Sequence, residues 1–467
     1  MEERDIVVIG GGPGGYIAAI RAAQLGARVT LVEERELGGT CVNRGCIPTK
    51  FLLHSVDVYQ SIKAAGQYGI SVNEVSLDLL EMQGHKNEII TTLVSGIQGR
   101  LDRNNIEFIS GRAKLTPSRQ VEVDSGQGQK QTIQAGRVII ATGSKPMVLP
   151  IPGADSPDIM GAESILNLDQ LPKTAVIIGG GVIGVEMATI LAKLGCRVSI
   201  VEMMPHCLPT QDAEIALGLQ DILREEGTQV HCNARVNRIE DSKDGKTVFF
   251  VEGTMEQRLE AEAVAISVGY EPNIANIGLE ECGVAIDKGG IKVNERMETS
   301  IPGIYAAGDV IGGIMLAYIG FAEGKVAAEN AMGRDSKMNY QAVPQCIFTL
   351  PEVASVGLTE EEAAAQGYEL QIGRFPFVAN AMAAILGERR GLVKIITEKQ
   401  YGQILGVHII GPRATSLIPE AALALKLEAT TEDIVATMHA HPSLSEAVWE
   451  AALDVTGETL HYGSQNK

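Results

Sequence analysis

The chain contains one internal repeat, which restricts its fold more than any other feature. Residues 6–33 (IVVIGGGPGGYIAAIRAAQLGARVTLVE) and 175–202 (AVIIGGGVIGVEMATILAKLGCRVSIVE) align without a gap, and 14 of the 28 positions are identical. Each copy has the pattern of an apolar strand, a G-x-G-x-x-G turn, an Ala-rich helix ending at Leu-Gly, and a second strand ending in Glu. The repeat predicts two nucleotide-binding units within an α/β fold.

The glycines of each copy fall where a dinucleotide-binding turn requires them. They allow a tight turn, backbone approach to a pyrophosphate and close packing of helix on strand, and the helix N-terminus then faces the phosphates. These glycines are Gly10, Gly12 and Gly15, and Gly179, Gly181 and Gly184. Glu33 and Glu202 each follow 18 residues later, where a carboxylate accepts ribose hydroxyls. Because Glu202 would repel a 2′-phosphate and VEMMPHCLP contains no Arg, we expect NAD rather than NADP at the second copy.

Two further stretches favour a flavin dinucleotide at the first copy. RVIIATGSKP (137–146) and IPGIYAAGDVIGG (301–313) are each an apolar strand running into a turn of small residues. Either stretch alone is also compatible with a core strand followed by a glycine turn. Asp309, after the second strand, is typical of a ligand to a polyol chain.

Composition excludes several classes of partner. The net charge of −19 argues against nucleic acid or an anionic membrane as a partner, and no run of eighteen apolar residues occurs. The stretch from Met1 to Asp5, directly before IVVIG, lacks the features of a signal or transit peptide. Seven cysteines in 467 residues, an odd and sparse set, fit a reducing compartment. We therefore expect a cytoplasmic protein with no membrane span.

Cys41 and Cys46 lie five positions apart in GGTCVNRGCIPTK (38–50). This spacing differs from the Cys-x-x-Cys of zinc knuckles, and no second Cys or His pair follows at a zinc-like distance. A disulfide that closes so short a loop removes little entropy from the unfolded chain and is a weak structural cross-link. These observations favour a chemical role for the pair over a structural one, and a position at the start of a helix would lower the thiol pKa.

Taken together, these motifs resemble the pyridine nucleotide-disulfide oxidoreductases. The resemblance rests on the repeat, on G-G-T-C-x4-C-x3-K (38–50), on A-T-G (141–143), on Ala307-Gly308-Asp309 and on HAHPSLSE (439–446), and it covers essentially the whole chain. It implies two Rossmann-like dinucleotide-binding domains, for FAD and NAD, and a C-terminal α+β dimerisation domain. With linkers at 145–155, 268–273 and 339–346, the expected segments are 1–147 (FAD, first part), 148–272 (NAD), 273–343 (FAD, second part) and 344–467 (interface).

The resemblance also implies the site, in which the Cys41–Cys46 pair is redox-active. Cys46 is expected to be the thiolate against the flavin and Cys41 the outer sulfur that exchanges with substrate. Lys50 is expected near the flavin, paired with Glu186, and His441 is expected to be a general base held by Glu446. The implied FAD residues are Gly10, Gly12, Gly15, Glu33, Gly39, Thr40, Lys50, Ala113, Thr142, Gly143, Ser144, Asp309, Met315, Leu316, Ala317 and Tyr318. The implied NAD residues are Gly179, Gly181, Val182, Ile183, Gly184, Glu186, Glu202 and Gly269.

The implied reaction oxidises a protein-bound dihydrolipoamide to lipoamide and passes the electrons through FAD to NAD. The implied partners are a second copy of the chain, whose base reaches the disulfide of this one, and the lipoyl domain of a 2-oxoacid dehydrogenase complex or a glycine cleavage carrier protein. The His441–Pro442 peptide is expected to be cis. The chain departs from the family pattern at Tyr318 and Leu350.

Other interpretations use the same motifs. The alternatives are another NAD(P)H-dependent disulfide reductase, a mercuric reductase, an NADH oxidase or diaphorase, and a flavin-bound sensing subunit. His439 beside His441 suggests a metal, but no third ligand is near, so we expect no metal site. Ser443 or Ser445 could also cap a helix with Glu446 in its first turn. We expect surface or satisfied core positions for His54, His85, His206, His231, His408 and His461, and small buried residues at Cys196, Cys207, Cys232, Cys282 and Cys346.

Overall fold

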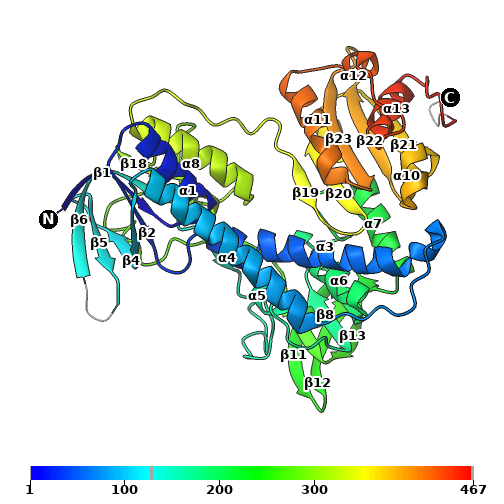
Figure 1. Cartoon of the computed structure of the whole chain (residues 1–467), viewed down its shortest axis with the longest axis horizontal. Helices are drawn as coiled ribbons and strands as arrows, with labels where there is room; N and C mark the ends of the chain where they lie inside the picture. The colour runs from blue at the N-terminus through cyan, green and yellow to red at the C-terminus, as the bar shows by residue number, and fades with distance from the viewer. Residues whose placement is uncertain (1, 127–129, 464–467) are drawn as a thin grey trace. The chain divides into compact units, whose positions relative to one another are not determined.

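The computed structural model describes residues 2–126 and 130–463, which fall into two compact units (Figure 1). The first unit takes the chain up to Leu52, Asp78–Val148 and Gly269–Asn339; the second takes Leu53–Leu77, Leu149–Val268 and the chain from Tyr340 onward. The predicted α/β architecture is confirmed by the sheets described below. The four-segment domain division stays a prediction, because 148–272 and 344–467 fall largely within one unit.

The first unit is built on a seven-stranded sheet with the order β3-β2-β1-β6-β5-β4, to which β18 is added by pairing with β6. The strands are β1 (Glu2–Ile9), β2 (Val29–Glu33), β3 (Glu107–Ser110), β4 (Arg112–Leu115), β5 (Gln120–Asp124), β6 (Lys130–Ile140) and β18 (Ile304–Ala306). Pairs β1–β2, β1–β6, β2–β3 and β6–β18 are parallel, whereas β4–β5 and β5–β6 are antiparallel. The parallel pair β1–β2 needs a crossover, which helix α1 (Pro13–Gln24) supplies.

Both faces of this sheet are buried along its central strand. Ile6 and Val8 of β1 belong to one core cluster, while Val7 belongs to the cluster on the other face, because successive strand side chains alternate. The first cluster is covered by α1, α4 (Leu79–Arg103) and α8 (Ala317–Ala331), and α1 lies beside α8 in Figure 1. A Cβ at Gly324 would lie 2.1 Å from the Gly14 carbonyl oxygen, so glycine sets the close approach of α1 and α8. Short elements complete the unit: β7 (Ser144–Pro146), β15 (Tyr270–Pro272), β16 (Ile286–Asp287), β17 (Gly290–Ile291) and the 3-10 turn η2 (Asp309–Ile311).

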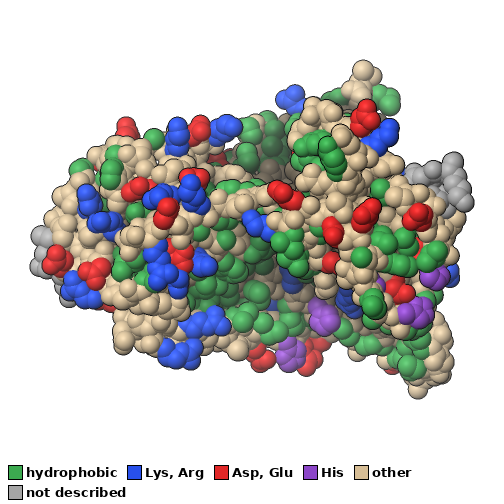
Figure 2. Space-filling view, turned by 90° about the horizontal axis from the view of Figure 1, so that it is seen from above, with side chains coloured by type: hydrophobic (Ala, Val, Ile, Leu, Met, Phe, Trp, Pro, Cys, Tyr) green, Lys and Arg blue, Asp and Glu red, His purple; other side chains and the backbone are tan. Residues whose placement is uncertain are grey.

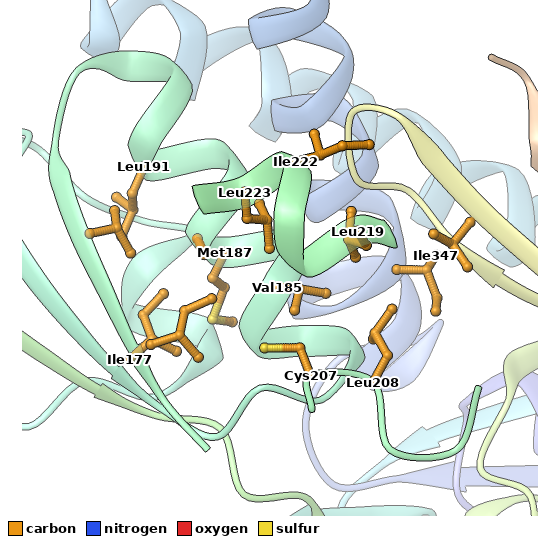
Figure 3. Packing of buried hydrophobic residues seen from close by; sticks show 14 of the residues in the cluster. Ile177, Val185, Met187, Leu191, Cys207, Leu208, Leu219, Ile222, Leu223 and Ile347 are labelled. Atoms are coloured by element: carbon orange, nitrogen blue, oxygen red, sulfur yellow. The ribbon is translucent and has the colours of Figure 1, made fainter. Parts of the chain in front are cut away.

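The second copy of the repeat forms a smaller parallel sheet in the second unit, with the order β10-β9-β8-β14. Figure 3 shows side chains of β8, α6 and α7 packed together, with Ile347 of β19 in the same cluster. A three-stranded antiparallel sheet, β11-β12-β13, adjoins this segment in the sequence. The elements are α5 (Ala162–Ile165), β8 (Thr174–Ile178), α6 (Val182–Leu194), β9 (Arg197–Val201), α7 (Ala213–Glu225), β10 (Gln229–His231), β11 (Ala234–Ser242), β12 (Gly245–Glu252), β13 (Met255–Ala261), β14 (Ala263–Ile266) and β19 (Gln345–Ile347).

The last part of the chain forms an antiparallel sheet with the order β19-β20-β23-β22-β21. Helix α11 contacts β20 and β23, and α13 contacts β21 and β22. Every residue of β23 is buried, as expected for a strand in the middle of a covered sheet. The elements are β20 (Glu352–Gly357), α9 (Glu360–Ala365), β21 (Leu370–Pro376), η3 (Phe377–Ala379), α10 (Ala381–Leu386), β22 (Leu392–Glu398), β23 (Ile404–Gly411), α11 (Ala414–Lys426), α12 (Thr431–Ala436) and α13 (Glu446–Val455).

A buried charged cluster joins α7 to this last sheet. Lys394 of β22 is only 1% exposed, and its Nζ lies 2.8 Å from Asp212 Oδ1, 2.7 Å from Glu360 Oε2 and 3.1 Å from Glu214 Oε2. The Arg374 guanidinium lies 2.9 Å from Glu214 Oε1. Burial alone would raise the pKa of Asp212, but the hydrogen bond from Lys394, the His408 and Lys394 charges and the hydrogen bond from Glu360 N together outweigh it, so the pKa lies below its ordinary value. The cluster is therefore held in its charged form.

We expect Lys394→Met to lower the free energy of unfolding by about 3–5 kcal/mol, because it leaves Asp212 buried without its cation. Lys399→Met is the matched control: the Lys399–Glu369 pair is exposed, and its loss should cost at most ~1 kcal/mol. A carboxyl with a lowered folded-state pKa stabilises the protein above its ordinary pKa, and this contribution fades as pH falls through the lowered value. In chemical denaturation, the deficit of Lys394→Met should therefore shrink on acidification; equal losses in both variants would contradict the argument.

Several smaller sequence predictions can be compared with the structure. The His441–Pro442 peptide is cis, as predicted, and Leu350–Pro351 is also cis, which the sequence did not indicate. Cys196 and Cys207 are buried, but three other cysteines are only partly buried: Cys232 follows a strand end, Cys282 lies in a turn, and Cys346 lies on the edge strand β19. His408 is buried, yet its Nδ1 has no hydrogen-bond partner, so the expectation of a satisfied core histidine is wrong for that atom.

Two observations concern the surface. None of the helices within residues 2–126 and 130–463 combines the length and apolar character needed to cross a membrane. On the face shown in Figure 2, acidic and basic side chains are interspersed rather than separated into large fields. The remaining helical elements are α2 (Gly39–Arg44), α3 (Cys46–Lys63) and η1 (Ala65–Tyr68).

Candidate active site

The turn after β1 has a backbone that only glycine allows. Gly10 has φ +105°, and a Cβ there would lie 2.1 Å from the Ala141 carbonyl oxygen. A Cβ at Gly15 would lie 1.8 Å from the Gly10 carbonyl oxygen. Gly12 is the N-cap of α1 and makes no side-chain cap, so the first N–H groups of the helix remain available to an anion.

The turn after β8 repeats this geometry. Gly179 also has φ +105°, a Cβ at Gly184 would lie 2.0 Å from the Gly179 carbonyl oxygen, and Gly181 is the N-cap of α6. Val182 and Ile183 are the first two residues of α6. Both turns therefore fit the pyrophosphate of a dinucleotide.

Glu33 and Glu202, the last residues of the two repeat copies, are held by equivalent backbone hydrogen bonds that the sequence did not predict. Glu33 Oε2 accepts a hydrogen bond from Gly11 N at 2.6 Å, and Glu202 Oε2 accepts one from Gly180 N at 2.5 Å. In each case Oε1 accepts a hydrogen bond of 2.7 Å from the N–H two residues further along the chain. A carboxylate oxygen has a second lone pair, so both side chains can still accept ribose hydroxyls.

The other half of the first nucleotide site lies at the carboxyl ends of β6 and β18, neighbouring parallel strands. Ser144 Oγ donates to Asp309 Oδ2 at 2.7 Å, and Thr142 Oγ1 donates to the Asn273 carbonyl oxygen at 2.8 Å. Burial raises the pKa of Asp309, although the Ser144 hydrogen bond opposes this shift. In open α/β sheets, ligands bind beyond the carboxyl ends of the strands, so these side chains fit a dinucleotide's sugar and polyol groups.

The remaining residues expected at the flavin lie in two places, at the start of α8 and in the core of the first unit. Leu316, which follows Met315, is the N-cap of α8, and Ala317 and Tyr318 are the first two residues of this helix. One turn into α8, a Cβ at Gly320 would lie 3.4 Å from Gly14 N, so this helix start lies near the first glycine turn. The Ala113 side chain is packed in the core of the first unit, which leaves only its backbone for a cofactor.

The segment that carries the two candidate cysteines is attached directly to the first glycine turn. Gly38 N donates to the Gly11 carbonyl oxygen at 2.9 Å, and Gly38 and Gly39 have φ values of +94° and +60°. A Cβ at Gly39 would lie 2.6 Å from Gly12 Cα. Glycine is therefore required at residues 38 and 39 to bring helix α2 (Gly39–Arg44) against the turn.

The structure brings the thiols of Cys41 and Cys46, both partly buried, into hydrogen-bonding range of each other. Cys41 lies inside α2, which includes Thr40, and Cys46 is the first residue of α3. The pKa of Cys41 is raised, first by its hydrogen bond with Cys46 and second by burial, while the Lys50 charge opposes the shift. The prediction of a lowered pKa is therefore wrong for Cys41, because a neighbouring sulfur and burial outweigh the helix.

His441 and Glu446 form the predicted pair. His441 Nδ1 lies 2.8 Å from Glu446 Oε1, and Ser443 N donates to Glu446 Oε2 at 2.8 Å. Burial of Glu446 is outweighed by these two hydrogen bonds, which hold its pKa below the ordinary value. The His441 side chain is 68% exposed, so its Nε2 is the ring nitrogen free to take a proton from a substrate. Ser445 is the N-cap of α13 but makes no side-chain cap.

Among the histidine–carboxylate pairs that the sequence did not reveal, two lie near His441 along the chain. His439 Nε2 lies 2.8 Å from Glu420 Oε1, and His461 Nδ1 lies 2.6 Å from Glu450 Oε1. Partners 19 and 11 residues apart leave no local pattern that would reveal them. In the described part of the chain, no group of three His, Cys, Asp or Glu side chains is placed to hold a metal ion.

Three predicted site residues belong to two different units, so the structure describes the surroundings of each only within its own unit. Glu186 of α6 is buried, and its Oε1 accepts a hydrogen bond from Phe348 N at 2.9 Å. Lys50 lies on α3. Gly269 has φ +114° and is the first residue of the Gly269–Asn339 segment of the first unit. The Lys50–Glu186 pair and the contact of Gly269 with NAD stay predictions.

Comparisons with known proteins agree with this geometry. Residues 4–324 match the family model described as pyridine nucleotide-disulphide oxidoreductase, and residues 343–452 match the dimerisation domain of the same family. The chain is 41% identical to mitochondrial dihydrolipoyl dehydrogenase of Pisum sativum (98% of this chain, 93% of that protein) and 40% identical to dihydrolipoyl dehydrogenase of Bacillus subtilis (98% and 99%). It is also 42% identical to leghemoglobin reductase of Glycine max (97% and 87%). Among solved structures, LpdA from Mycobacterium tuberculosis matches with a TM-score of 0.89 and 29% identity (97% and 99%).

Proposed function

Because the chain belongs to the pyridine nucleotide-disulphide oxidoreductase family, we propose that it is a dihydrolipoyl dehydrogenase. It oxidises protein-bound dihydrolipoamide to lipoamide and reduces NAD⁺, with FAD and NAD as its cofactors. The observation that carries the proposal is the placement of the Cys41–Cys46 pair against the glycine turn of the first nucleotide fold. The His441–Glu446 pair supports it, because oxidation of a dithiol requires a base.

The side chains divide the reaction as follows. His441 takes the proton of one substrate thiol, and the resulting thiolate attacks the Cys41 sulfur of the Cys41–Cys46 disulfide. That S–S bond breaks, Cys46 leaves as a thiolate, and the substrate is held on Cys41 as a mixed disulfide. The second substrate sulfur then attacks the first, which closes lipoamide and releases Cys41; the second thiol's proton passes to Cys41. Glu446 holds the imidazole in position and stabilises its charged form.

The nucleotide turns supply the electron acceptors. When bound, FAD would supply a two-electron acceptor for the dithiol, and NAD⁺ would supply the final acceptor of a hydride. Gly10, Gly12 and Gly15 would hold the FAD pyrophosphate, and Asp309 would bind its polyol chain. The turn Gly179–Gly184 with Glu202 would hold NAD, while Lys50 and Glu186 would form an ion pair near the flavin.

One set of steady-state assays tests the function. The purified holoenzyme should reduce NAD⁺ with free dihydrolipoamide, and should show little activity with glutathione disulfide and NADPH or with Hg²⁺ and NADPH. Turnover with oxygen or a quinone but none with dihydrolipoamide would replace the proposal with an NADH oxidase or diaphorase. No turnover with any of these pairs would favour a flavin-bound sensing subunit.

We expect NAD to be preferred over NADP by at least about 100-fold in kcat/KM. The buried Glu202 carboxylate is fixed by two backbone N–H groups and would face a 2′-phosphate of like charge, which costs several kcal/mol. Glu202→Gln removes the negative charge and should therefore lower the ratio of kcat/KM for NAD to kcat/KM for NADP by roughly tenfold or more. Steady-state kinetics with both nucleotides measure this, and the dihydrolipoamide KM serves as the internal control. Comparable kcat/KM values in the unmodified enzyme would show that Glu202 does not face the ribose.

The dimerisation-domain match supports a homodimer, and the exposed apolar side chains discussed below agree with it. The proposed partner in turnover is the lipoyl domain of a 2-oxoacid dehydrogenase complex or of a glycine cleavage carrier protein. We place the enzyme in the cytoplasm, since its cysteines are few and odd in number. Cell fractionation would test both the proposed partner and the proposed location. The activity should be recovered in cytoplasmic fractions that contain lipoylated proteins.

A further inference from the structure

A second pair of cysteines lies together in the second nucleotide fold. Cys207 belongs to the loop between β9 and α7, and Cys232 follows the last residue of β10. Although 25 residues separate them, their thiols lie within hydrogen-bonding range of each other. The buried Gln220 of α7 joins the two: its Oε1 accepts from Cys207 N at 3.2 Å and from the Cys232 thiol at 3.0 Å.

The two thiols differ as an attacking and a resolving sulfur differ. Cys232 is partly exposed, and its pKa is lowered, first by the hydrogen bond from the Cys207 thiol and also by the Arg224 charge, against burial. Cys207 is fully buried, and its pKa is raised, first by the same hydrogen bond and second by burial. A partly exposed thiol with a lowered pKa is the more reactive of such a pair.

Cys207 also touches the glycine turn that would hold NAD. A Cβ at Gly180 would lie 2.9 Å from Cys207 Sγ, and Leu208 N donates to the Gly180 carbonyl oxygen at 2.9 Å. The Gly180 N–H is the group that holds Glu202 Oε2. Leu208 has φ +54°, a conformation that is strained for a branched side chain. A displacement of Cys207 is therefore transmitted to both the turn and the carboxylate.

We propose that Cys207 and Cys232 form a second redox-active dithiol, whose oxidation by a low-molecular-weight organic disulfide weakens the binding of NAD. The Cys232 thiolate attacks the external disulfide RSSR, which gives a mixed disulfide and releases RS⁻. Cys207 then attacks the Cys232 sulfur, loses its proton to solvent, and releases the second RS⁻. The products are one protein disulfide and two reduced RSH molecules once both thiolates take up protons.

The expected effect on NAD follows from geometry. Two sulfurs in hydrogen-bonding contact must approach to about 2.05 Å to form the bond, so the Cys207 side chain, the Cys232 side chain or both must shift. Cys207 is packed against Gly180, so a shift of Cys207 acts on the adenosine half of the NAD site. The NAD part of the inference rests on the proposed function, whereas formation of the disulfide does not.

The disulfide is tested by peptide mapping of the holoenzyme after treatment with glutathione disulfide. Trypsin cuts after Arg197, Arg224 and Arg235, so Cys207 and Cys232 fall on the separate peptides 198–224 and 225–235, and Cys196 falls on neither. We expect these two peptides to be linked, and the link to be absent in Cys232→Ser and present in Cys196→Ser. If peptides 198–224 and 225–235 stay unlinked while the Cys41 and Cys46 peptides become linked, the second dithiol is refuted.

The effect on NAD is measured by calorimetric titration of NAD⁺ into the same samples, without dihydrolipoamide. The treatment acts on Cys41 and Cys46 alike in wild type and in Cys232→Ser, so the treated samples differ only at the second pair. Treatment should raise the Kd for NAD⁺ at least threefold in wild type and leave the Kd unchanged in Cys232→Ser. If Cys232→Ser is unstable, Cys207→Ala serves in its place. Equal affinities in fully linked wild type would refute the coupling, while failure of the proposed function would appear separately as no NAD⁺ binding in any sample.

Discussion

Replacing Cys41 or Cys46 with serine should lower dihydrolipoamide:NAD⁺ turnover by about four orders of magnitude or more, the scale of losing a catalytic nucleophile. Serine has nearly the same size as cysteine but cannot form the disulfide that accepts the substrate's electrons. The contact of α2 with the first glycine turn is made at Gly38 and Gly39 and involves neither thiol, so the fold should persist. Steady-state assays with dihydrolipoamide give the loss directly.

Two readouts separate loss of chemistry from loss of structure. Oxidation of NADH by ferricyanide does not need the dithiol, so both variants should keep it; Cys282→Ser, a partly buried cysteine in the first unit, should keep both activities. In the resting enzyme, Cys41→Ser should show the long-wavelength absorbance of a thiolate beside bound flavin, and Cys46→Ser should not. The reverse pattern would exchange the roles of the two sulfurs, and full turnover in either variant would remove the pair from the reaction.

The sequence predicted the parts of the site that depend on local backbone geometry. Both glycine turns form as expected, because Gly10 and Gly179 share the same positive φ and each is crossed by a carbonyl oxygen from a neighbouring strand's end. The pairing of His441 with Glu446 was likewise within reach, since five residues on one loop and helix start bring them together.

The sequence did not predict contacts between residues that are far apart in the chain. Ser144 and Asp309 are 165 residues apart and meet only because β6 and β18 pair in parallel. Lys394 has the sequence context of an ordinary strand lysine, and its burial depends on Asp212, 182 residues earlier, at the start of α7. Cys207 and Cys232 were predicted only to be small buried residues, because no periodicity shows that two loop ends will place their sulfurs together.

Exposed apolar side chains of the C-terminal segment argue for a partner next to the histidines. Leu423, Leu427 and Met438 are 60%, 69% and 99% exposed, and Met438 immediately precedes the segment from His439 to His441. A monomer in water gains nothing from exposing this much apolar surface, whereas a symmetric partner would bury it. We expect an obligate homodimer that buries more than roughly 2,000 Å².

If His441 serves the disulfide of the other subunit, mixed dimers will show it. A dimer of one Cys41→Ser chain and one His441→Gln chain, isolated with two different tags, has one site with both wild-type residues and one with neither. We expect about half the activity of the wild-type dimer, although loss of the base alone costs about 10²–10⁴-fold and each parent homodimer is nearly inactive. The matched control pairs a wild-type chain with a Cys41→Ser/His441→Gln double variant. In that dimer each composite site lacks one residue, so activity should nearly vanish, whereas sites confined to one chain would make the control half-active and the first dimer inactive.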